Sequence, residues 1–326
     1  MTAERSRQLL FQMRRIRHVE EEIARRYAEG AMRCPTHLSI GQEAVAAAVG
    51  LALRPTDLAV SGHRAHAHYL GKGGSLPAML AEIYGRVDGC SRGKGGSMHL
   101  IDESVGFMGS TAIVGGTIPV GVGLAYGMKL ERTDQVSCIF HGDAAVETGA
   151  FFESLNFAVV KKLPVLFVCE NNLYSVYSPL HVRQPPDRSI AEMARAIGAR
   201  VSVGDGNDPE DVLRQVDDAV ERIRSGGGPC LLEFATYRWL EHCGPNYDNH
   251  IGYRTVDEYL GWKARDPIPR YESELAADGV VDQAALRTMA EDIEREVAEA
   301  FRFAEASSFP DGSEAFTHLY HEAAAA

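Results

Sequence analysis

The sequence lacks the features that mark secreted, membrane-spanning and disulfide-stapled proteins. Charged residues interrupt every apolar stretch of the first 30 residues, which excludes a signal peptide. No apolar run approaches the roughly 18 residues that a membrane-spanning helix needs. The six cysteines are scattered and include no CxxC pair. We therefore expect a cytoplasmic protein without structural disulfides.

An excess of basic residues is also missing. The 326 residues include 33 Lys and Arg against 45 Asp and Glu, so the formal net charge is −12. This balance argues against nucleic acid or an anionic membrane as a partner, and solubility explains it better. There is no internal repeat and no linker, so residues 1–326 are expected to form a single domain with one large core.

Short apolar runs alternate with segments of helical periodicity along most of the chain. We expect strands at 57–63, 136–140, 164–170, about 200–203 and 229–238. Helices are expected at 4–29, 41–53, 76–86, 115–130, 147–161, about 189–197, after Asn207 or Asp208, and at 283–306. This alternation predicts an α/β protein with a mostly parallel sheet covered by helices on both faces. Around it we expect a helical N-terminal extension (about 1–55), an irregular segment (about 239–254) and C-terminal helices (about 255–306).

Two polar residues follow neighbouring strands of the predicted sheet. Asp143 follows the apolar run 136–140, after His141 and Gly142. Asn172 follows the run 164–170. Because one helix separates the two strands, their carboxyl ends should lie side by side, where parallel sheets bind ligands. A carboxylate and an amide oxygen suit Mg²⁺ that completes its shell with phosphate and water. The alternative, with even weight from spacing alone, is that both residues cap helices.

Two other motifs give weaker indications of a binding site. The segment "HRAHAH" (63–68) places three histidines within six residues and could hold zinc, but it lacks the fixed helical spacing of an HExxH site. The glycine-rich stretch 88–100 contains no GxxxxGK[ST] pattern and is not a phosphate-binding Walker loop.

A Gly-Asp pair, a helix, a strand and Asn-Asn at this spacing resemble the thiamine diphosphate motif. The chain from about Leu10 to about Tyr259 is similar to the alpha subunit of the two-chain 2-oxo acid dehydrogenases of the pyruvate, branched-chain and acetoin type. The matching segments include "HLSIGQEA" (37–44), "GHRAH" (62–66), "AIVGGTIPVGVGLA" (112–125), "KLPVLFVCENN" (162–172) and "TYR" (236–238). The resemblance implies a thiamine-diphosphate-binding fold.

The resemblance also implies roles for particular residues. Thiamine diphosphate and Mg²⁺ would be the cofactors. The metal would be held by Asp143, Asn172 and the backbone carbonyl of Tyr174. The diphosphate would bind Arg64, with His63 where the family commonly has tyrosine. Backbone around Ala112, Ile113, Val114 and Gly115 would hold the aminopyrimidine, and Gly142, Ala144 and Ala145 would surround the metal residue. His242, His37 and His66 match histidines that line the cofactor site.

The implied activity is decarboxylation of a 2-oxo acid, or cleavage of acetoin, with transfer of the acyl group to a lipoyl acceptor on a separate acyltransferase. The partner would be a beta subunit that supplies the activating glutamate, in an assembly of two alpha and two beta chains. Three glutamates of this chain could substitute for it (Glu43, Glu147 and Glu170), but none is expected to reach the pyrimidine. The glycine-rich helix 117–130 is expected to build the partner surface, with Gly121, Gly123 and Gly127 allowing close packing.

Two alternatives stay open. The first is a thiamine-dependent decarboxylase or acyloin-forming carboligase that uses no lipoyl acceptor. The second is a catalytically silent structural subunit. Its only support is Ala144, which stands where the family usually has glycine and would cost roughly 1 kcal/mol in a position of positive φ.

Overall fold

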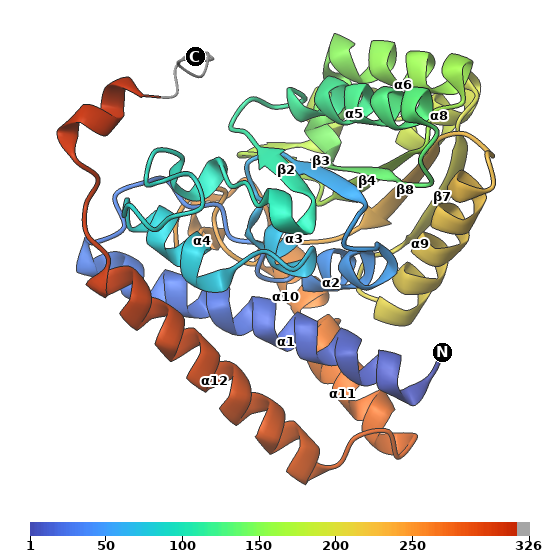
Figure 1. The fold of residues 1–326 in the computed structure, drawn as a ribbon. Coiled ribbons are helices and arrows are strands. Elements are labelled where there is room, and N and C mark those ends of the chain that lie inside the picture. The colour runs from blue at the N-terminus through green and yellow to red at the C-terminus, as the bar shows by residue number, and fades with distance from the viewer. Residues whose placement is uncertain (318–326) are drawn as a thin grey trace.

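The computed structural model describes residues 1–317 of the chain and contains one six-stranded parallel sheet (Figure 1). Its strands lie in the order β2-β1-β3-β4-β8-β7. They are β1 (Leu58–Ser61), β2 (Phe107–Ser110), β3 (Ser137–Gly142), β4 (Val165–Asn171), β7 (Arg200–Asp205) and β8 (Cys230–Ala235). A separate antiparallel pair consists of β5 (Tyr174–Ser175) and β6 (Ser178–Pro179). The central pair β3 and β4 are sequence neighbours, as expected of a βαβ unit.

Helices cover both faces of the sheet (Figure 1). One layer contains α5 (Thr117–Glu131), α6 (Gly149–Lys161) and α8 (Ile190–Ile197). On the other face lie α2 (Glu43–Ala52), α3 (His66–Gly71) and α9 (Pro209–Arg224). Beyond them α1 (Ala3–Arg26) lies between this layer and α12 (Gln283–Ala306). The remaining helices are α4 (Leu76–Ile83), α7 (Leu180–Arg183), α10 (Val256–Lys263) and α11 (Pro267–Ala277). No helix of residues 1–317 is both long and apolar enough to cross a membrane.

Successive residues of the strands enter two separate hydrophobic cores. In β4, Leu166 and Val168 pack on the side of α2 and α9, whereas Val165 and Phe167 pack on the side of α5 and α6. Side chains alternate across a strand, so a sheet buried on both faces needs apolar residues at consecutive positions. This explains why its strands read as uninterrupted apolar runs and confirms the predicted α/β fold class.

The differences from the expected elements lie in short segments. β8 spans Cys230–Ala235, so the expected strand 229–238 begins one residue too early and ends three residues too late. The four residues of β2 and the six of α3 were not expected as regular elements. β2 carries Gly109 at φ +139° and forms by pairing with β1, not by its own propensity. Of the three α5 glycines that were expected to allow close packing, Gly121 packs closely against Ile139, whereas a Cβ on Gly123 or Gly127 would meet no atom within 4 Å among the described residues.

Candidate functional site

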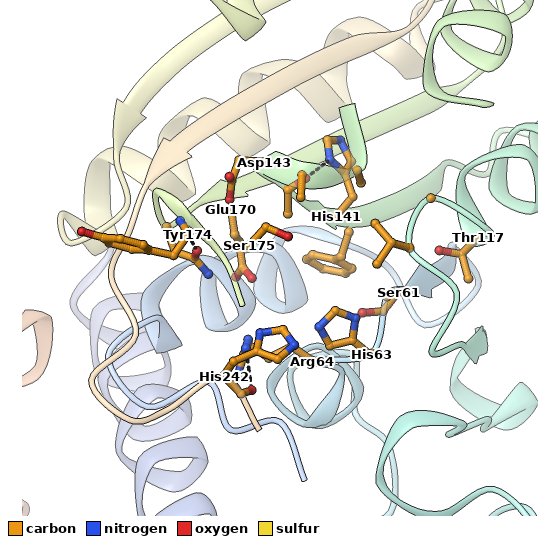
Figure 2. A pocket seen from close by; sticks show the side chains of 18 of the residues that line it. Ser61, His63, Arg64, Thr117, His141, Asp143, Glu170, Tyr174, Ser175 and His242 are labelled. Carbon is orange, nitrogen blue, oxygen red and sulfur yellow. Dashed lines mark hydrogen bonds between the residues drawn. The ribbon is translucent and has the colours of Figure 1, made fainter. Parts of the chain in front are cut away.

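A cavity opens at the carboxyl ends of β1, β3 and β4 (Figure 2). Ser61, Asp143 and Asn172 stand at or directly after the last residues of these three strands. Eleven of the residues predicted for the site line the cavity: His63, Arg64, Val114, Gly115, Gly142, Asp143, Ala144, Ala145, Asn172, Tyr174 and His242. The βαβ reasoning that brought Asp143 and Asn172 to one edge of the sheet is therefore correct.

At one end of the cavity, buried oxygen atoms converge. The Asp143 side chain is nearly inaccessible and forms an ion pair with Arg183 of α7, which also pairs with Glu147. Burial raises the pKa of Asp143, and Arg183 together with backbone N–H groups of Asp143 and Asn172 opposes that rise. Gly142, not Asp143, precedes the 3₁₀ turn Asp143–Glu147, and no side-chain cap forms there. The helix-cap alternative for Asp143 is therefore wrong.

The segment after β3 and the segment after β4 differ in backbone strain. Ala144 is absent from the residues of positive φ, so its methyl group costs nothing in this turn. Leu173 and Val176, by contrast, have φ of 72° and 54° and flank the β5 residue Tyr174. Bulky residues in this region carry a cost of about 1–3 kcal/mol each, and such positions cluster at ligand sites.

Arg64, His63 and His242 lie together at the opposite end of the cavity (Figure 2). Arg64 donates from Nη1 to the Leu38 carbonyl (2.6 Å) and from Nη2 to the His242 carbonyl (3.1 Å). It forms no ion pair with a carboxylate among the residues that the structure describes. Burial lowers the pKa of Arg64 to about 10, so the guanidinium stays charged at neutral pH. A cation without an anionic partner in a cavity is suited to an anionic ligand.

His37 completes a cluster of three imidazoles with His63 and His242. The ring of His37 lies 4.6 Å from that of His63 and 4.9 Å from that of His242, between centroids. Burial first, and the Arg64 charge next, lower the pKa to about 2 for His37, about 4 for His63 and about 3 for His242. All three rings are therefore neutral at pH 7, when each has one N–H to donate and one nitrogen to accept.

The three imidazoles could in principle hold a metal ion, because their ligand atoms lie within 4.8 Å of one another. The adjacent charge of Arg64 opposes a second cation there. The zinc cluster considered for "HRAHAH" is not formed. His63 faces the cavity, whereas His66 is fully buried, with Nε2 2.8 Å from Ser97 Oγ and Nδ1 3.3 Å from Glu20 Oε1. His68 also lines the cavity, but it is stacked on Phe140, with Nε2 beside Glu170 and Nδ1 beside Ser61.

Four predicted residues are not among those that line the cavity: Ala112, Ile113, His37 and His66. Ile113 is 68% exposed and projects outward, and the Ala112 N–H lies 3.4 Å from His99 Nε2. His37 contacts the cavity histidines, so it reaches the site through them. The position of His66 favours support of the N-terminal helix and the loop at Ser97 over direct contact with a ligand.

Sequence reasoning missed several residues of the site. Gln42, Ser61 and His68 line the cavity together with Glu170, which had been considered only as an alternative activator. Arg183 was not considered, although it bonds the central carboxylate. These residues come from segments far apart in the sequence, and no local pattern marks them. A polar residue within an apolar strand, such as Glu170 in β4, is the one signal that could have attracted attention.

The residues present fit a metal-bound diphosphate. Asp143 and Asn172 supply hard oxygen donors at one end of the cavity, and Arg64 supplies a cation without a carboxylate partner at the other. His37 Nδ1 is buried and has no hydrogen-bond partner within the described residues. A buried polar atom of this kind, beside such a cavity, is explained by a ligand or water that it bonds.

Comparison with known proteins shows similarity over nearly the whole chain. Residues 11–313 match the model of the family described as "Dehydrogenase E1 component". The chain is 36% identical to the alpha subunit of the acetoin:2,6-dichlorophenolindophenol oxidoreductase of Bacillus subtilis, covering 98% of this chain and 95% of that protein. It is 34% identical to the pyruvate dehydrogenase E1 alpha subunit of Rickettsia bellii, covering 94% and 92%. The corresponding subunit of Rhizobium meliloti is 35% identical, with coverage of 93% and 86%.

Proposed function

The chain belongs to the family of dehydrogenase E1 components, and we propose that it is the alpha subunit of a thiamine-diphosphate-dependent 2-oxo acid dehydrogenase. Its substrate is a 2-oxo acid, or acetoin, and the acyl group passes to a lipoyl acceptor on a separate acyltransferase. The observation that supports this most directly is the position of Asp143 and Asn172 at adjacent strand ends, across a cavity from Arg64, which has no carboxylate partner among residues 1–317.

Mg²⁺ would be held by the side chains of Asp143 and Asn172 and by the carbonyl of Tyr174. The diphosphate would be bound by Arg64 and by N–H donors of His63 and His242. Charge-assisted hydrogen bonds, as from Arg64, are about twice as strong as neutral ones, which favours the diphosphate over unphosphorylated thiamine. Backbone groups of Val114 and Gly115, which line the cavity before α5, would hold the aminopyrimidine.

When bound, thiamine diphosphate supplies the carbanion that adds to the ketone of the substrate. The protein's part is binding, orientation and control of protons. Because His37, His63 and His242 are neutral, each can donate one N–H to a substrate or phosphate oxygen and accept one hydrogen bond at its other nitrogen. Burial, together with the Arg64 charge beside them, keeps the imidazoles neutral, and Arg64 favours an anionic substrate.

A beta subunit is required for activity in this proposal, because each of the three candidate activating glutamates is engaged by other residues of this chain. Glu43 is fully buried and bonds Arg17 and the Gly41 N–H. Glu147 pairs with Arg183. Glu170 lies on the cavity floor, with His68 and Gln42 on its two oxygens. Releasing Glu43 or Glu170 would leave a buried charge unpaired, which costs several kcal/mol.

The outer face of α5 is the surface that we assign to the partner chain. Val120, Gly123, Gly127 and Leu130 recur at helical spacing, and a Cβ on Gly123 or Gly127 would meet no atom within 4 Å. Exposed Tyr126 packs edge to face on exposed Phe157 of α6, at 5.6 Å between centroids. Exposed apolar side chains gathered on neighbouring helices are typical of an interface. An assembly of two alpha and two beta chains would cover it.

Calorimetry tests the cofactor assignment. Thiamine diphosphate should bind the alpha chain, together with its beta-type chain, in the presence of Mg²⁺, and binding should be lost when EDTA removes the metal. Thiamine diphosphate that binds equally well without any divalent cation would contradict the metal site. Absence of binding under both conditions would favour the silent-subunit alternative, which Ala144 no longer supports.

A further inference from the structure

The side chain of Asn172 belongs to a hydrogen-bonded chain that runs across the cavity floor. Asn172 Nδ2 donates to Gln42 Oε1 (3.1 Å), and Gln42 Nε2 donates to Glu170 Oε2 (3.3 Å). The other Glu170 oxygen lies 3.2 Å from His68 Nε2, and His68 Nδ1 lies 2.8 Å from Ser61 Oγ. All five side chains are buried and all line the cavity.

The carboxylate of Glu170 imposes a direction on this series of hydrogen bonds. A carboxylate only accepts hydrogen bonds, so the amide of Gln42 must turn its NH₂ toward Glu170. The carbonyl oxygen of Gln42 then faces Asn172, which must turn its own NH₂ toward Gln42. If either amide were reversed, two acceptors or two donors would meet in a buried place, at a cost of about 1–3 kcal/mol.

The direction determines which atom of Asn172 is available to a ligand. With Nδ2 committed to Gln42, the carbonyl oxygen Oδ1 is turned the other way, where it accepts one hydrogen bond from the Tyr174 N–H (3.2 Å). An amide carbonyl oxygen has two lone pairs, so one remains for a cation. A reversed amide would present an NH₂ group to the cation and would repel it.

We propose that Gln42 is a positioning residue for the metal site: it fixes the amide of Asn172 with its oxygen toward the cation, and Glu170 fixes the direction of Gln42. This inference rests on the proposed function, because it assumes that Asn172 binds the divalent cation. It adds two residues, 128 positions apart, whose roles come only from their contacts with each other and with Asn172.

The two residues permit a swap experiment. In Glu170→Gln the carboxylate is lost and nothing forces the direction of Gln42. In Gln42→Glu two carboxylates face each other and the donor to Glu170 is lost. The double variant Gln42→Glu with Glu170→Gln restores the series of hydrogen bonds. The new amide donates to the new carboxylate, which still accepts from Asn172 Nδ2. The double variant also keeps the net charge and nearly the same side-chain volumes.

The measurement is Mn²⁺ affinity in the presence of thiamine diphosphate, with free Mn²⁺ counted by electron paramagnetic resonance on the full chain together with its beta-type chain. Loss of such supporting partners typically weakens metal affinity about 10- to 100-fold. We expect each single variant to weaken Mn²⁺ binding by about this factor and the double variant to return within about threefold of wild type. Gln8→Glu, at an exposed position of α1, is the control for one added negative charge. This variant should bind Mn²⁺ like wild type.

The outcomes separate this inference from the function on which it rests. Wild-type affinity in both single variants would overturn it, as would a double variant no tighter than the weaker single one. If the wild-type chain binds no Mn²⁺ with thiamine diphosphate, the proposed cofactor site itself fails. Thermal unfolding without metal identifies any variant that loses affinity because it is unfolded.

Discussion

Replacement of Gly121 by alanine tests how closely α5 packs within the chain, separately from its packing against a partner chain. An ideal Cβ there would lie 2.4 Å from Ile139 Cγ1, 2.7 Å from Ile139 Cδ1 and 3.0 Å from Val60 Cγ2. Carbon atoms pack at about 3.5–4.0 Å, so α5 or β3 must shift. Overpacking of this kind costs about 1–3 kcal/mol.

Gly127→Ala is the matched control, because it makes the same change in the same helix where no atom lies within 4 Å. Alanine is favoured over glycine in a helix by about 1 kcal/mol at both positions, so the difference between the variants isolates the packing cost. We expect Gly127→Ala to raise the unfolding free energy slightly. Gly121→Ala should lie about 1–3 kcal/mol below it.

Urea unfolding followed by circular dichroism measures both variants on the isolated chain. Equal unfolding free energies would refute the close packing of α5 on β3.

The same pair of variants also tests the partner surface. Gly127→Ala should weaken association with the beta-type chain in sedimentation experiments, although it stabilises the isolated chain. Unchanged association would place the interface elsewhere.

Three further expectations concern the cavity. Asp143→Ala should abolish Mg²⁺-dependent binding of thiamine diphosphate and leave the circular dichroism spectrum unchanged; unaltered calorimetric affinity would remove Asp143 from the metal site. Arg64→Ala should weaken binding of thiamine diphosphate far more than binding of unphosphorylated thiamine, and equal losses would exclude a phosphate contact. In the folded chain the pKa of His37, His63 and His242 lies at about 2 to 4, below the value of about 6.5 in unfolded chains. Unfolding therefore takes up protons, and stability should fall as pH decreases from about 6.5 toward 4; a flat pH dependence would contradict neutral histidines.

The parts of the fold that were predictable from sequence are those with strong periodic or continuous apolar patterns. β3 and β4 were evident because strands buried on both faces need apolar residues throughout. Asp143 and Asn172 could be brought together because parallel strands end at the same edge of a sheet. β2 was not predicted, since its glycine-containing sequence has low strand propensity and its formation depends on β1.

The contacts within the site were less predictable, because they join segments distant in the sequence. Gln42 and Asn172 are 130 positions apart, and neither has a neighbour that indicates the other. Arg183 reaches Asp143 from a four-residue helix that has no periodic signal. "HRAHAH" looked like one cluster, but the start of α3 at His66 sends His63 and His66 to different surroundings. Spacing in the sequence does not determine these directions.

The central claim is that this chain works only as one half of a thiamine-diphosphate enzyme. The direct measurement is dye-linked oxidation of several 2-oxo acids and of acetoin, with thiamine diphosphate and Mg²⁺, using the purified chain with and without its beta-type chain. We predict turnover with both chains and none with this chain alone. Robust turnover by the chain alone would contradict the account and would make Glu43, Glu147 or Glu170 the activating residue.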